Sequence, residues 1–178
     1  MLNETAPPVI GQLILDEFAR HLKMAGTPVA GENSEAETAL RAAIAHLEAQ
    51  LGLALIERRF EWLCKAFDGR NIRAPMAPVS EILSVMRQQP TGDGIPIEPT
   101  AIILDRSDLR TQILPRVVTS EPILLEFVAG FGPSWSDTPP DLQRASFMLA
   151  AHYFDTRHDV GDAGVAVPHG VAALIAAW

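Results

Sequence analysis

The sequence predicts an α+β fold: a small helical bundle with an inserted antiparallel strand-rich region and a C-terminal helical arm. Apolar residues recur at helical spacing towards both ends of the chain, whereas the middle holds short apolar runs separated by turn residues. We therefore expect one domain of 178 residues, helical over 1–57, strand-rich over 58–132, helical again over 133–160, and closed by an arm over 161–178.

Two helices are expected before residue 57. Asp16 is the expected N-cap of the first, because its carboxylate can accept N–H groups of the first turn, and Gly26 is its expected end. Ser34 and Glu37 have the spacing of a capping box, so the second helix is expected to begin there and to end at Gly52. Its apolar positions follow a helical period: Leu40, Ile44, Leu47 and Leu51.

The middle of the chain predicts antiparallel strands, because its apolar runs are short and Gly- or Pro-rich turns separate them. The expected strands are 59–67, 81–88, 101–105, 112–118 and 123–128. Pro115 lacks a backbone N–H, so the fourth run is expected to be an edge strand or a bulged strand.

The last third predicts a tight turn, a long helix and a short arm. Residues 130–132, Gly-Phe-Gly, suggest a turn that needs positive φ. Asp137 or Thr138 is the expected N-cap of a helix that runs to about Arg157. Apolar residues cover nearly all of its circumference, so it is either central in its own subunit or covered by a neighbour. The arm that starts at Pro168 is expected to lack a partner in its own chain and to dock on another protein.

Composition excludes several classes of protein. The net charge of −8 argues against a dedicated nucleic-acid-binding surface. Its distribution is uneven: residues 1–57 carry −5, residues 58–116 carry +2 and residues 117–178 carry −5. No apolar run is long enough to predict a membrane span, and no signal-peptide pattern is present, so synthesis in the cytoplasm is expected. The single cysteine, Cys64, is expected to be a buried, inert thiol.

Chemical motifs are sparse. His152, Asp155 and His158 could form a metal or ligand site, but the two histidines lie about 120° apart around a helix. A solvated polar stripe is the simpler interpretation. No nucleophile motif and no phosphate-binding loop is present, so we expect no catalytic residues, metal or cofactor. Trp135 and Trp178 are expected either to anchor an interface or to fold back on their own core.

Four segments together resemble one family, the head–tail connector (adaptor) proteins of long-tailed bacteriophages and gene transfer agents. They are 14–24 (ILDEFARHLKM), 39–55 (ALRAAIAHLEAQLGLAL), 77–85 (APVSEILSV) and 126–178. In the last of these, the order is strand, Ala-Gly-aromatic-Gly turn, prolines, long apolar helix and a final Val-Pro-x-Gly-Val segment. The chain departs from the family pattern in stopping at Trp178, without a following basic residue.

This resemblance implies a structural virion protein. It implies a ring of identical subunits, twelve to match the portal, placed between the portal and a further tail or stopper protein. DNA would pass through the lumen without sequence-specific binding, and no membrane or catalysis is involved. The implied location is the head–tail interface of a virion or gene transfer agent particle. Two alternatives remain open: a small metal- or ligand-binding protein that uses His152, Asp155 and His158, and an assembly factor absent from finished particles.

Apolar excess and charge asymmetry suggest two contact surfaces. The expected portal or subunit interface consists of Phe147, Tyr153, Arg157, His169, Leu174, Ile175 and Trp178. A secondary charged interface, expected to pair with an acidic neighbouring subunit or with the next tail component, consists of Arg58, Arg59, Arg70 and Arg73.

Overall fold

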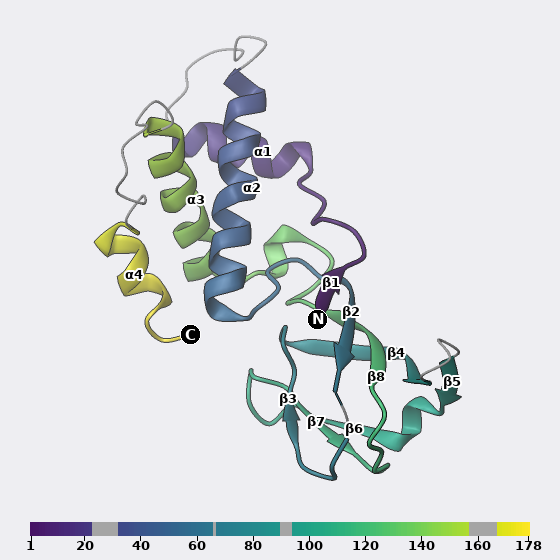
Figure 1. Cartoon of the computed structure of the whole chain (residues 1–178). Helices are drawn as coiled ribbons and strands as arrows, with labels where there is room; N and C mark the ends of the chain where they lie inside the picture. Colours follow the sequence, from purple (N-terminus) through teal and green to yellow (C-terminus); the bar gives the residue numbers. More distant parts are fainter. Residues whose placement is uncertain (23–31, 66, 90–93, 157–166) are drawn as a thin grey trace. The chain divides into compact units, whose positions relative to one another are not determined.

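The computed structural model describes residues 1–22, 32–65, 67–89, 94–156 and 167–178. It confirms the predicted α+β class, with helices α1–α4 and two antiparallel sheets (Figure 1). The chain forms two compact units. The sheet unit comprises Met1–Pro8 and Gly52–Ser134, and the helical unit comprises Val9–Leu51 and Trp135–Trp178. The assignment of the whole chain to one domain stays a prediction.

The helical unit is built around two long helices, α2 (Glu32–Leu51) and α3 (Pro140–Asp155), which pack against each other (Figure 1). The helix α1 (Gln12–His21) packs against α2, and α4 (His169–Ile175) packs against α3. The inward faces carry the apolar residues that the helical period predicted. The buried side chains of α2 and α3 include Leu40, Ala43, Ile44, Leu47, Leu142, Ala145 and Leu149. Among the described residues, no helix has both the length and the apolar character needed to cross a bilayer.

The predicted N-caps were wrong in α1, α2 and α3. The helix α1 begins at Gln12 rather than near Asp16, because its buried face already includes Ile14. The helix α2 begins at Glu32, so Ser34 lies inside its first turn. Pro139, and neither Asp137 nor Thr138, precedes α3. The expected end of α1 at Gly26 lies outside the described residues, whereas Gly52 follows α2 with a φ of 64°.

The sheet unit contains two antiparallel sheets. The first has five strands in the order β1-β2-β8-β4-β5, formed by Leu2–Glu4, Arg58–Cys64, Ile123–Ala129, Val79–Gln88 and Gly94–Ile97. The second has three strands in the order β3-β7-β6, formed by Ile72–Arg73, Gln112–Pro115 and Ile102–Asp105. A short 3₁₀ turn, η1 (Pro99–Ala101), precedes β6.

Both sheets contribute to one apolar core. Alternate residues of the central strand β8 are buried, as expected for a strand with one face inward. The second sheet adds Ile102 and Ile113 to the same cluster. From the five-stranded sheet the cluster takes Phe60, Cys64, Val79, Val85, Ile123, Leu125, Phe127 and Ala129.

The structure corrects the prediction for Pro115. The strand β7 is the middle strand of its sheet, not an edge strand. Pro115 is tolerated because it is the last residue of β7 and pairs only with Ile102, whereas β3 pairs only with Gln112 and Ile113. The strands β1, β3 and β5 were not predicted, because they have two to four residues each and are too short for a periodic signal.

The predicted glycine turn is confirmed at Gly130, which has a φ of 144°. Its N–H donates to the carbonyl of Pro78 at 2.9 Å, and the N–H of Glu57 donates to the carbonyl of Gly132 at 2.8 Å. A Cβ on Gly130 would lie 2.3 Å from Cα of Glu57, which is far inside van der Waals contact. Only glycine therefore allows the chain leaving β8 to pass this close to the segment before β2.

We expect Gly130→Ala to lower the free energy of unfolding by about 3 kcal/mol or more, because it combines backbone strain with a backbone clash. Urea unfolding followed by circular dichroism measures the change. Gly11→Ala is the control: nothing lies within 4 Å of its Cβ position, and replacing a glycine N-cap by alanine should cost no more than about 1 kcal/mol. Equal stability of the two variants would contradict the role assigned to Gly130.

Candidate functional site

The C-terminal segment has a partner in its own chain, which corrects the expectation of an unpartnered arm. Val171 and Ile175, one turn apart on α4, are buried as α4 packs against α3. A Cβ on Gly170 would lie 2.7 Å from Cε of Met148, so the start of α4 lies very close to α3. The indole N–H of Trp178 donates to Oδ2 of Asp141 at 2.7 Å. The arm is therefore part of the helical unit.

Phe147 also belongs to this unit rather than to a free surface. Its ring centroid lies 5.7 Å from that of Phe18 and 5.6 Å from that of Trp135. His21 lies at the edge of the same cluster, with its ring centroid 5.8 Å from that of Phe147. Of the two alternatives for Trp135, the structure supports burial in its own core, where 7% of its surface is exposed.

Tyr153 joins α3 to α2. Its hydroxyl and Nδ1 of His46 are 3.0 Å apart and share a hydrogen bond. Burial raises the pKa of Tyr153 above its ordinary value of 10.0. Beside this pair, Tyr153 and Phe154 of α3 face α2 across a groove of about 390 Å³. From α2 the groove is lined by Ser34, Glu35, Thr38, Ala39 and Ala42.

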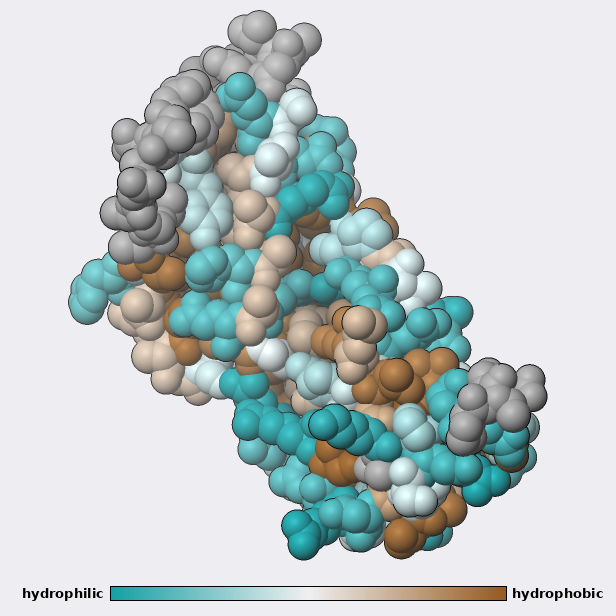
Figure 2. Space-filling view, in the orientation of Figure 1, coloured by the Kyte–Doolittle hydropathy of each residue, from teal (hydrophilic) through white to brown (hydrophobic). Residues whose placement is uncertain are grey.

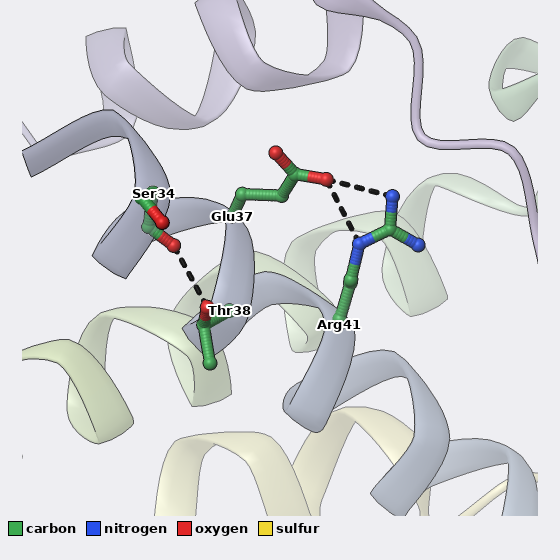
Figure 3. A network of polar contacts seen from close by, with 4 residues as sticks. All are labelled: Ser34, Glu37, Thr38 and Arg41. Carbon is green, nitrogen blue, oxygen red and sulfur yellow. Dashed lines mark hydrogen bonds and ion pairs between the residues drawn. The ribbon is translucent and has the colours of Figure 1, made fainter. Parts of the chain in front are cut away.

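A polar network on α2 holds the groove-lining residue Thr38 in place (Figure 3). Its hydroxyl donates to the carbonyl of Ser34 at 2.8 Å. One turn further, both Nε and a terminal nitrogen of Arg41 donate to the same carboxylate oxygen of Glu37, at 2.9 and 2.7 Å. Glu37 and Arg41 lie four residues apart, so their ion pair stabilises the helix locally.

The accessible part of the predicted interface is the outer face of α4. His169 is exposed, whereas Leu174 and Trp178 are partly buried. The exposed alanines of this face are Ala172, Ala173, Ala176 and Ala177. Figure 2 shows the region of α4 largely in pale brown, the colour of mildly hydrophobic residues. Arg157, the remaining member of the predicted set, lies outside the described residues.

The four arginines of the predicted charged interface have different environments. Arg58 forms an ion pair with Glu4, and its Cζ lies 4.9 Å from the ring centroid of Phe60. A terminal nitrogen of Arg59 lies 4.0 Å from Oε1 of Glu126, and Nε of Arg70 lies 3.6 Å from Oδ2 of Asp68; both ion pairs are on the surface.

Arg73, the fourth arginine, lines a separate cleft with Arg110. No sequence pattern indicates a role for Arg110, because only the sheet register brings its loop beside β3.

The metal hypothesis finds no support in the part of the chain that the structure describes, where no three His, Cys, Asp or Glu side chains form a metal-binding group. His158 lies outside the described residues. Cys64 is buried, as predicted, and its thiol lies 3.4 Å from the carbonyl of Ile123. Burial raises the pKa of this thiol, which disfavours the reactive thiolate.

Tyr153→Phe should lower the free energy of unfolding by about 1 kcal/mol at neutral pH, because it removes the hydrogen bond to His46. A raised pKa means that the folded chain holds the phenol proton more tightly than the unfolded chain does. The contribution of protonated Tyr153 to the free energy of unfolding is therefore complete at a pH below the ordinary pKa of 10.0, and it is lost as the pH rises further.

Urea unfolding between pH 8 and pH 11 measures this difference between the wild-type chain and the variant. Tyr153 is the chain's one tyrosine, so phenolate absorbance in the folded and unfolded chain reports on this residue alone. An identical titration in both states would contradict the assigned burial.

This architecture is shared with chains of known structure. No model of a known protein family matches the chain, and no curated protein matches it. Three solved structures match over the whole chain and over 94% of their own chains. A chain from the neck of an empty gene transfer agent (GTA) particle, computed with C6 symmetry, is 37% identical with a TM-score of 0.82. A chain from the virion of a native GTA particle is 33% identical with a TM-score of 0.80.

A third matching chain, from the neck of a native GTA particle computed with C12 symmetry, is 35% identical with a TM-score of 0.74. Identity above 30% over the full length, together with the shared fold, establishes common family membership. The protein belongs to the head–tail connector (adaptor) family of long-tailed bacteriophages and gene transfer agents, together with these chains from the neck of gene transfer agent particles.

Proposed function

We propose that this chain forms a twelve-membered ring that joins the portal of a capsid to the tail and lines the passage for DNA. The observation that carries the proposal is the full-length match to chains from particle necks solved with C6 and C12 symmetry. A closed ring of identical subunits needs two different surfaces on each subunit, one for each neighbour. The portal on one side and a further tail or stopper protein on the other complete the proposed set of partners.

Charge supports a passage that does not retain DNA. The helical unit carries eleven acidic and five basic residues, a net charge of −6, whereas the sheet unit carries eleven acidic and nine basic residues, a net charge of −2. Neither unit has the excess of lysine and arginine that phosphate neutralisation requires. An acidic wall repels phosphates, so DNA can move past it. The proposed role is structural and involves no chemical step.

The outer face of α4 is the proposed contact with the portal. It retains His169, Leu174 and Trp178 from the predicted interface, whereas Phe147 and Ile175 serve the subunit's own core. Alanines on this face allow a partner's backbone to approach closely. Tyr153, beside the groove between α2 and α3, is the proposed subunit contact.

A particle preparation tests the proposal directly. We expect mass spectrometry to find the chain in purified particles, and electron microscopy to place it as a ring between the portal and the tail. Absence of the chain from finished particles would contradict the proposal and support the assembly-factor alternative. Stoichiometric metal in elemental analysis of the purified protein would instead support the metal-binding alternative.

Ala173→Arg tests the portal contact without touching the buried face of α4. We expect at least a tenfold loss of the chain from particles, because a charged side chain would have to be buried in the contact. Ala49→Arg is the control, an exposed alanine on α2, and should leave incorporation unchanged. Both variants should show the same melting temperature as the wild-type chain. Normal incorporation of Ala173→Arg would exclude this face as the portal contact.

A further inference from the structure

A polar cleft in the sheet unit has the composition of a carboxylate-binding site. It has a volume of about 330 Å³ and is lined by Asn71, Arg73, Asp108, Arg110 and Gln112. Two guanidinium groups and two side-chain amides offer many N–H donors, whereas Asp108 supplies the one carboxylate among the lining residues. Guanidinium groups bind carboxylates through two parallel hydrogen bonds, so this donor set suits that partner.

The register of β3 and β7 places Arg73 and Gln112 on the same face of the three-stranded sheet. Arg73 of β3 pairs with Gln112 of β7, and the amide of Asn71 donates to Oε1 of Gln112 at 3.4 Å. The next register pair, Ile72 and Ile113, belongs to the apolar core. Because successive side chains of a strand point to opposite faces, Arg73 and Gln112 lie on the outer face of the three-stranded sheet.

The loop that carries Arg110 is held at both ends. Arg106 donates from Nε to the carbonyl of Val79 at 3.0 Å. Thr111 is fully buried. Its hydroxyl accepts a hydrogen bond from the N–H of Val79 at 3.0 Å, and the carbonyl of Thr111 accepts one from the N–H of Ala74 at 3.1 Å. The backbone on either side of Arg110 is therefore fixed before any partner arrives, which lowers the entropic cost of binding.

Electrostatics in the cleft favour an incoming anion. Partial burial lowers the pKa of Arg110, and the neighbouring charge of Arg73 lowers it further, while Asp108 acts in the opposite direction. Two cations that line one cleft repel each other, and a second carboxylate between them would offset that repulsion. A protein carboxylate suits the site better than the DNA backbone, because Asp108 would face the phosphates and the unit as a whole carries −2.

We propose that the Arg73–Arg110 cleft receives an acidic side chain from the helical unit of the next copy of this chain. The inference rests on the proposed ring, in which every subunit meets another copy on each side. Charge complementarity supports the choice of partner, since the helical unit carries −6. The contact would be a charged link between sheet unit and helical unit of adjacent subunits, separate from the portal contact on α4.

Charge reversal in assembled particles tests the contact. Arg73→Glu/Arg110→Glu should reduce incorporation of the chain at least tenfold relative to wild type. Lys65→Glu/Arg116→Glu is the control, since it makes the same charge change at two exposed residues of the same unit and should be incorporated normally. Arg73→Glu alone, at an exposed residue, covers the case in which the double variant fails to fold, as its melting temperature would show. Incorporation of a folded cleft variant at the level of the control would overturn the proposal.

A photo-crosslinking residue at Gln112 identifies the occupant. In particles, we expect crosslinked peptides that join residue 112 to residues 9–51 or 135–178 of a second copy. Crosslinks to DNA, to a different protein or to no neighbour would each overturn the proposal. These outcomes are distinct from failure of the proposed function, because in that case the wild-type chain itself would be missing from the neck.

Discussion

Burial of α3 is the constraint on which the helical unit depends. This helix carries more apolar surface than one neighbour can cover, and three helices share it. Leu142, Ala145 and Leu149 are fully buried, with α2 and α4 packed against the helix. Phe147 extends the contact to α1 through Phe18. The helix α4, with seven residues, is too short to be stable in water alone, so its order depends on docking against α3.

This arrangement determines what the unit can offer to partners. Once Val171 and Ile175 are buried, α4 presents mainly alanine, with His169 and the partly buried Leu174 and Trp178 beside it. As the proposed portal contact, such a face would bind with modest strength. In a ring, many copies of a modest contact act together, so that a stable assembly requires no strong individual contact. This property suits subunits that assemble on a template and not in free solution.

The sheet unit is stabilised in a different way from the helical unit. Its two sheets share one core. The chain leaving β8 passes so close to the segment before β2 that Gly130 has no space for a side chain. Two hydrogen bonds fix the loop beside β7: Arg106 donates to the carbonyl of Val79, and the hydroxyl of Thr111 accepts the N–H of Val79. The unit therefore presents polar groups from a rigid backbone, whereas the helical unit presents a mildly apolar helix. In the proposed ring, two surfaces of different chemistry would allow one subunit to distinguish its partners.

Much of the fold could be predicted from the sequence because it depends on local patterns. The period of Leu40, Ile44 and Leu47 predicted α2, and the alternation of short apolar runs predicted the strands β2, β4 and β8. Helix starts were wrong, because tertiary burial of Ile14 extended α1 beyond the residue with the best capping side chain. The resemblance to head–tail connectors was correct at the level of the family, since it rested on the order of elements over nearly the whole chain.

The candidate surfaces were less predictable, for a physical reason. Apolar residues such as Phe147 and Ile175 look the same in a sequence whether they meet their own chain or another one. Only the packing of α4 on α3 decided that Ile175 belongs to the subunit's core, and only the contacts of Phe147 with Phe18 and Trp135 decided the same for Phe147. Likewise, Arg73 and Arg110 lie far apart in the sequence, and the pairing of β3 with β7 decided that they share one cleft. The sequence by itself determined the longer elements and their family. The tertiary structure decided the helix starts, the shortest strands and the side chains that remain available to partners, because all of these depend on long-range contacts.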